Sequence, residues 1–221
     1  MLAPRELILT FHGLGEPPEG VEEAERKVWV PVQWFEAIVA ALAPRGVGLA
    51  FDDGNASDAK DALPVLARRG LTGRFFVLAG RLGQEGYLNA ADVADLRAAG
   101  MVIGSHGLHH RDWRTLSDGE LREELVVSRH TLADALGEEI VEAACPFGSY
   151  DRRVLGALRK AGYRRVYNSD GGSGSARAWL TPRTTVHRDR PLADWLALAA
   201  AGAAGRPSPV GLGKRLVKRL R

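Results

Sequence analysis

The sequence predicts an α/β protein whose parallel strands form a closed or nearly closed barrel, and two observations lead to this fold class. Short β-rich runs alternate with helix-like segments seven times over the 221 residues, which is typical of parallel strands joined by helices. Polar residues suited to chemistry follow most of these runs, where a barrel of this kind places its active site. They are His12, Asp52, Asp53, Ser105, His106, Cys145, Pro146, Ser169, Asp170 and His187.

Hydrophobic periodicity and turn residues set the expected boundaries of the elements. Strands are expected over residues 7–11, 48–51, 74–78, 101–104, 140–145, 165–168 and 184–187. Helices are expected over residues 32–42, 59–69, 152–161 and 192–203, and also after Asn89 and after Ser117. Asn89 is a typical N-cap, and Ser117 with Glu120 matches a capping box. Pro64 should kink the helix that contains it.

The length suits one well-buried domain, which we place at residues 1–205, followed by a basic tail at residues 206–221. The last eight residues carry five positive charges and no negative one. Such a tail is either a solvated helix end or a weak contact with an acidic membrane surface.

Several function classes are disfavoured by composition. The sequence shows no recognisable signal peptide and no apolar run near the ~20 residues needed to span a bilayer. We therefore expect a cytoplasmic protein, associated with a membrane only through the tail. No basic face is interleaved with aromatic residues, so no nucleic-acid partner is expected. The single cysteine, Cys145, excludes an internal disulfide.

Two adjacent carboxylates end the second expected strand. On an ideal strand Asp52 and Asp53 would point to opposite faces, so both reach one pocket only if the strand ends and twists there. Two close carboxylates push their pKa values apart, which suits one as a charged ligand and the other as a proton acceptor. The alternative is an Asp-Gly turn that happens to carry two charges.

A histidine cluster follows the fourth expected strand, where three of the six histidines fall within five residues. His106 and His110 are spaced i and i+4, which places both imidazoles on one face of a helical turn and suits a shared metal ion. One carboxylate from the aspartate pair completes a set with open coordination positions, which indicates catalysis more than structure.

Three motifs, taken in order, carry a family resemblance. Phe51-Asp52-Asp53-Gly54, His106 to His110 and Cys145-Pro146-Phe147-Gly148 resemble Thr-Phe-Asp-Asp-Gly, His-Ser/Thr-x-x-His and the end of Arg-x-Pro-Tyr/Phe-Gly. These motifs belong to the polysaccharide deacetylases of carbohydrate esterase family 4, the NodB-homology domain. Ala50, Gly107 and Ala144 replace the threonine, the hydroxyl residue and the arginine. The resemblance extends from about Gly48 to His187.

The resemblance implies a distorted (β/α)7 barrel of TIM-like type that holds a divalent metal, most commonly Zn²⁺, with Co²⁺, Ni²⁺ or Fe²⁺ as substitutes. Asp53, His106 and His110 would be the metal ligands. Asp52 would be the general base, accepting a proton from water made acidic by the metal. The implied reaction is removal of N-acetyl groups from an amino-sugar polysaccharide, oligosaccharide or glycolipid. Pro146, Phe147 and Gly148 would contact the substrate, with a backbone N–H near Phe147 at the oxyanion.

The departures from the family pattern raise further candidates. Because Ala144 stands where the family has an arginine that orients the base, we expect Arg183 to reach Asp52 from another side. The family's Leu-x-His motif is missing, so His187 and His12 are the two candidates for the general acid.

Other residues are candidates for the substrate pocket. Asp170 is expected to line it, and Trp113 and Trp179 are candidates for stacking on a sugar ring. Cys145 is expected to be buried and inert.

Two other functions stay open from the sequence. The missing arginine suits a non-catalytic relative that binds carbohydrate through the same groove. Two histidines and one carboxylate also suit a non-haem iron enzyme, although oxygen chemistry has no evident need for a second aspartate as a base.

Overall fold

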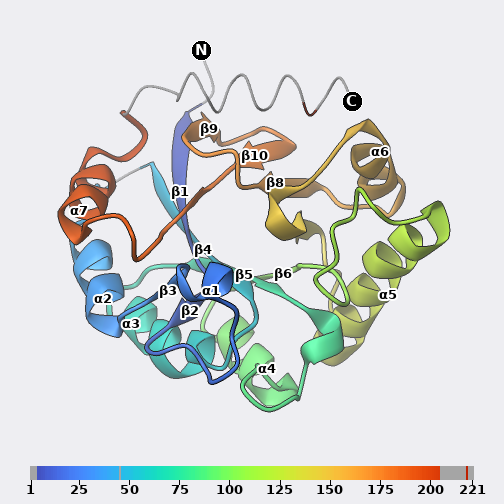
Figure 1. The fold of residues 1–221 in the computed structure, drawn as a ribbon, viewed down its shortest axis with the longest axis horizontal. Helices are drawn as coiled ribbons and strands as arrows, with labels where there is room; N and C mark the ends of the chain where they lie inside the picture. Colours follow the sequence, from blue (N-terminus) through green and yellow to red (C-terminus); the bar gives the residue numbers. More distant parts are fainter. Residues whose placement is uncertain (1–3, 45, 205–217, 219–221) are drawn as a thin grey trace.

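One large sheet forms the centre of the protein. The computed structural model describes residues 4–44, 46–204 and 218 (Figure 1). Within this part, eight strands follow the order β10-β8-β7-β6-β5-β4-β1-β11 and pair in parallel, and β9 pairs with β1 antiparallel. The strands are β1 (Arg5–Phe11), β4 (Val47–Asp53), β5 (Gly73–Val77), β6 (Val102–Ser105), β7 (Glu142–Ala144), β8 (Arg165–Asn168), β9 (Ser173–Ser175), β10 (Leu180–Pro182) and β11 (Thr184–Thr185).

The helices surround this sheet, as Figure 1 shows for α2 to α7. A smaller parallel sheet, β2 (Gly13–Leu14) with β3 (Trp29–Val30), lies in the segment after β1. The helices are α1 (Glu23–Arg26), α2 (Val32–Ala40), α3 (Leu63–Arg68), α4 (Ala90–Ala98), α5 (Asp118–Leu136), α6 (Arg152–Lys160) and α7 (Leu192–Ala201). A π-helical turn η1 (Asp58–Ala62) and 3₁₀ turns η2 (Ala79–Arg81), η3 (Pro146–Gly148) and η4 (Gly202–Ala204) complete the set.

The predicted barrel class is confirmed, because the eight-strand sheet curves into a nearly closed barrel. The seven expected strands correspond to β1, β4, β5, β6, β7, β8 and β11. The expected strand at 140–145 is shorter than predicted, and β2, β3, β9 and β10 were not predicted. The short β9 is made of serine and glycine, which carry no hydrophobic pattern.

Helix boundaries follow the predicted caps. Asn89 and Ser117 each make a complete capping box, at α4 and α5, and Gly137 ends α5 with a left-handed backbone. The helix expected over residues 59–69, in which Pro64 should introduce a kink, is not one uniform α-helix. A π-helical turn η1 runs directly into α3, and Pro64 is the second residue of α3.

Strand alternation separates two apolar clusters and determines which side of the sheet each side chain of β4 occupies. Phe51 stacks on Phe75 with ring centroids 4.5 Å apart in the large cluster beneath the helices. Ala50 instead belongs to a small cluster with Phe76 and Tyr167 inside the barrel. Because alternate residues of a strand share a face, Asp52 follows Ala50 into the barrel interior.

The described part has no helix that is long and apolar enough to cross a membrane. The predicted basic tail at residues 206–221 lies outside the described residues, apart from Lys218. The tail's membrane contact and the cytoplasmic location stay predictions.

Candidate active site

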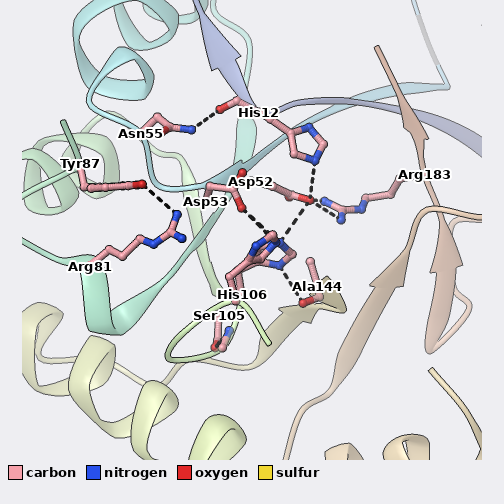
Figure 2. A network of polar contacts seen from close by, with 12 residues as sticks. His12, Asp52, Asp53, Asn55, Arg81, Tyr87, Ser105, His106, Ala144 and Arg183 are labelled. Atoms are coloured by element: carbon pink, nitrogen blue, oxygen red, sulfur yellow. Dashed lines mark hydrogen bonds and ion pairs between the residues drawn. The ribbon is translucent and has the colours of Figure 1, made fainter. Parts of the chain in front are cut away.

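The candidate site lies where several strands end. His12 follows β1, Asp52 and Asp53 end β4, His106 follows β6, and Arg183 follows β10. Figure 2 shows the side chains of His12, His106 and Arg183 directed toward Asp52 from three sides. The structure therefore brings together residues that are up to 171 positions apart in the chain, from His12 to Arg183.

Asp53 departs from strand geometry. Its φ is +76°, and Gly54 follows with a φ of +70°. Such a left-handed backbone costs a residue other than glycine about 1–3 kcal/mol and is found at functional sites. The turn breaks strand alternation, so both adjacent carboxylates face His106, with Oδ2 of Asp52 3.9 Å and Oδ1 of Asp53 3.5 Å from its Nε2. The Oδ1 atom of Asp53 lies 3.5 Å from Nε2 of His106 and 3.5 Å from Nε2 of His110.

The two histidines come together on a loop, and the predicted helical turn is wrong. Gly107 has a φ of +90° and His110 a φ of +55°, so the chain loops back and the ring centroids of His106 and His110 lie 5.1 Å apart. A Cβ at Gly107 would lie 2.7 Å from Oε2 of Glu124, so a side chain at this position would have to displace that carboxylate.

Glu124 of α5 anchors this loop, and it was not among the site residues predicted from the sequence. Its buried carboxylate accepts backbone N–H groups of Leu108 at 2.8 Å and of His109 at 3.2 Å. The sequence did carry a signal, because Glu124 lies on the buried face of a helix next to Leu121 and Leu125. A carboxylate in such a place needs hydrogen-bond donors.

The predicted stacking of Trp113 on a sugar is wrong. Trp113 is 0% exposed and belongs to the main apolar cluster, beneath Gly107. Trp179 precedes β10 at the opposite end of the strands from the site, and the guanidinium of Arg159 lies 3.9 Å from its ring centroid. Neither indole faces the site.

Asp53, His106 and His110 fit a divalent cation. Their ligand atoms lie within 4.8 Å of one another. Nδ1 of His106 bonds the carbonyl of Ala144 at 2.9 Å, and burial lowers the pKa of His106 to about 3, so its Nε2 presents a lone pair. Burial also raises the pKa of Asp53 to about 6, and its Oδ1 has no hydrogen bond. Lone pairs that face one another in this way are stabilised by a metal cation between them.

Asp52 is held by Arg183 through a two-pronged ion pair. Nη1 and Nη2 of Arg183 donate to the two carboxylate oxygens of Asp52 at 2.6 and 2.7 Å, and both side chains are buried. Burial would raise the pKa of Asp52, but the charge and hydrogen bonds of Arg183 hold it well below its usual range. Ala144 offers only its carbonyl, to His106. The position of Arg183 agrees with the expectation that it reaches Asp52.

The two candidate general acids lie in different surroundings. Nε2 of His12 is 4.0 Å from Oδ2 of Asp52, and the amide of Asn55 holds the carbonyl of His12 at 2.7 Å. His187 packs against Trp195 of α7, with ring centroids 6.3 Å apart. Within the described part, no hydrogen bond or ion pair joins the His187 ring to the site. His12 is therefore the better-placed candidate.

The third motif forms the wall beside His110. Phe147 has a φ of +57° and is 67% exposed, and its ring centroid lies 4.4 Å from that of His110. Pro146 and Gly148 are buried on either side of it. The neighbouring Cys145 is also buried, and burial raises the pKa of its thiol to about 12, as suits an inert thiol.

Asp170, which was expected to line the substrate pocket, follows β8. Its buried carboxylate accepts the hydroxyl of Tyr150 at 2.7 Å and the ammonium of Lys218 at 2.7 Å. Arg81, which sequence reasoning missed, lies on another side of the site, where its Nη1 donates to the hydroxyl of Tyr87 at 2.9 Å (Figure 2).

This α/β barrel carries a candidate metal triad and an arginine-paired aspartate at the ends of its strands. Both features are those of a candidate metalloenzyme. The family model described as "Polysaccharide deacetylase" matches residues 40–166. The chain belongs to the polysaccharide deacetylase family.

The chain is also similar to a curated relative and to solved structures. YxkH of Bacillus subtilis (strain 168) is 24% identical over 127 residues, which are 58% of this chain and 46% of YxkH, so the chain spans less than half of that relative. The deacetylase PplD of Streptococcus pyogenes, solved in complex with acetate, has a TM-score of 0.77 at 19% identity and covers 88% of this chain and 98% of its own. IcaB of Ammonifex degensii has a TM-score of 0.71 at 21% identity, over 90% of this chain and 99% of its own. At these identities the structural likeness shows the fold.

Proposed function

We propose that this chain is a metal-dependent hydrolase that removes N-acetyl groups from an amino-sugar polysaccharide, oligosaccharide or glycolipid. The observation that carries the proposal is that a candidate metal triad lies beside a second carboxylate. Asp53, His106 and His110 present unprotonated ligand atoms to one point, and Asp52 lies beside them with its charge fixed by Arg183. A ligand triad next to a second, ionised carboxylate suits hydrolysis, in which water must lose a proton as it attacks.

A divalent cation held by Asp53, His106 and His110 would supply a Lewis acid that polarises the acetamide carbonyl and acidifies water. Nδ1 of His106 is engaged with Ala144, which keeps its ring orientation and leaves Nε2 for the cation. Glu124 holds the loop that carries both histidines, so the triad stays assembled between turnovers.

Asp52 would accept the proton of the attacking water. Because Arg183 keeps the pKa of Asp52 below its usual range, the carboxylate is charged and ready throughout the neutral range. The same ion pair fixes the plane of the carboxylate, which orients the proton acceptor.

Protonation of the leaving amine is assigned to His12, on the observation that its Nε2 lies 4.0 Å from Asp52. The backbone N–H near Phe147 would stabilise the oxyanion, and the exposed ring of Phe147 would contact the sugar.

The arginine pairing also bears on the non-catalytic alternative. That reading depended on the loss of the motif arginine at Ala144, and Arg183 supplies an equivalent partner to Asp52. We therefore prefer the catalytic function.

The experiment is acetate release from N-acetylglucosamine oligomers, measured with chelator, with added Zn²⁺ and with added Co²⁺. The proposal predicts release that depends on metal and is absent with chelator. Binding of the oligomers with no release under any metal would overturn it in favour of a carbohydrate-binding relative.

A further inference from the structure

A lysine ammonium occupies a cage beside the candidate active site. Nζ of Lys218 lies 2.7 Å from Oδ1 of Asp170 and 2.8 Å from the carbonyl oxygen of Gly148. The same atom lies 5.1 Å from the ring centroid of Tyr150, within the range of a cation–π contact. Carboxylate, carbonyl and aromatic face together form a set that recognises a primary ammonium.

The cage is a built site. The side chain of Asp170 is 0% exposed, and its second oxygen accepts the hydroxyl of Tyr150 at 2.7 Å. Its backbone N–H donates to Oδ1 of Asn168 at 3.0 Å, which fixes the turn that carries the carboxylate. A buried carboxylate fixed in this way needs a cationic partner, because an unpaired buried charge is strongly unfavourable.

The cage lies next to the residues proposed for catalysis. Gly148 directly follows Phe147, whose ring packs on the candidate metal ligand His110. The side chain of Lys218 is 27% exposed, so its stem marks a path from the surface to Asp170.

We propose that Asp170, Gly148 and Tyr150 form a binding subsite for the free amine of a glucosamine unit, and that Lys218 occupies this subsite when no such unit is bound. The inference rests on the proposed function, because removal of an N-acetyl group leaves an amine that is protonated near neutral pH. A partly deacetylated glycan therefore carries ammonium groups beside acetamides. The subsite would let the chain prefer such a glycan over one that is fully acetylated.

The test is calorimetric titration of the full chain with two trisaccharides of the same linkage. The β-1,4-glucosamine trisaccharide carries amines, and the β-1,4-glucose trisaccharide carries hydroxyls in their place, so neither has an acetyl group to lose. Lys218→Ala removes the internal competitor and should tighten binding of the glucosamine trisaccharide by about tenfold or more. Adding Asp170→Asn to Lys218→Ala should abolish that gain.

The controls distinguish a ligand subsite from an internal ion pair that only stabilises the fold. The glucose trisaccharide should bind wild type and Lys218→Ala equally, and Lys160→Ala, which removes an exposed lysine of α6, should behave as wild type. Equal binding of the glucosamine trisaccharide by wild type and Lys218→Ala would overturn the proposal, and so would an equal gain for both trisaccharides. If Asp170→Asn fails to fold, the comparison of wild type with Lys218→Ala still decides.

Failure of the subsite and failure of the proposed function are distinguishable, because acetate release is measured separately. An inactive chain that shows the amine-selective gain retains the subsite and loses the hydrolase function. An active chain without that gain loses only the subsite.

Discussion

Replacement of Arg183 by alanine should impair both the stability of the fold and the proton acceptor. The guanidinium makes hydrogen bonds of 2.6 and 2.7 Å to Asp52, and the two side chains are 0% and 2% exposed. Removing one partner of a buried pair leaves an unpaired charge, which costs about 3–5 kcal/mol. At 1.36 kcal/mol for each pH unit, this free energy corresponds to a rise of about two to four units in the pKa of Asp52.

The assay is the pH profile of kcat/KM for acetate release, with unfolding followed in denaturant. With metal kept saturating at every pH, so that protonation of Asp53 does not limit the rate, Arg183→Ala should move the acid limb set by Asp52 upward by about two pH units or more. It should also lower the neutral rate by about 10- to 100-fold, through lost orientation of the base. Arg183→Lys keeps the charge but not the two-pronged geometry, so its acid limb should stay near that of wild type while its rate falls.

The double variant Arg183→Ala with Asp52→Asn should recover part of the lost stability, because the buried charge is gone. An unchanged kcat/KM and an unmoved acid limb in Arg183→Ala would refute the reasoning that Arg183 replaces the missing motif arginine.

Three further predictions concern the metal site and its wall. Glu124→Gln should lower metal affinity by about 10- to 100-fold in a chelator competition, because the ligand loop loses its anchor, whereas Glu123→Gln on the exposed face of α5 should not. Metal affinity should be level above pH 6 and fall by about tenfold per pH unit below it, because a proton then competes for Asp53, whose pKa is raised to about 6; a level affinity down to pH 4 would contradict this. Phe147→Gly should raise stability by about 1 kcal/mol in denaturant unfolding, through relief of the positive φ, while raising KM for the oligomers.

Much of the fold could be predicted because its strands are apolar runs that end at turn residues. β4 illustrates this, since its apolar residues lead into Asp52 and Asp53. The histidine pair was also found, but its helical geometry was wrong, because spacing alone does not reveal the left-handed backbone at Gly107 and His110. β9 was missed because three small residues give no periodic signal.

Whether a given side chain is buried or exposed was the second property that the sequence could not predict. Trp113 follows a site-bearing strand as a sugar-stacking residue would, yet it is fully buried under the ligand loop. Arg183 could be predicted because Ala144 leaves Asp52 without the family's motif arginine, so another cation was expected to pair with it. Glu124 carries no motif, and only its place among the buried residues of an amphipathic helix marks it as a carboxylate that needs hydrogen-bond donors.

The central claim is that Asp52 acts as the base and Asp53, His106 and His110 act as ligands, and one measurement separates these roles. Bound metal and acetate release are measured together for wild type, Asp52→Asn and Asp53→Asn. Asp52→Asn should retain stoichiometric metal and lose release by about 100-fold or more, whereas Asp53→Asn should lose the metal itself. Full release from Asp52→Asn, or full metal binding by Asp53→Asn, would contradict the assignment.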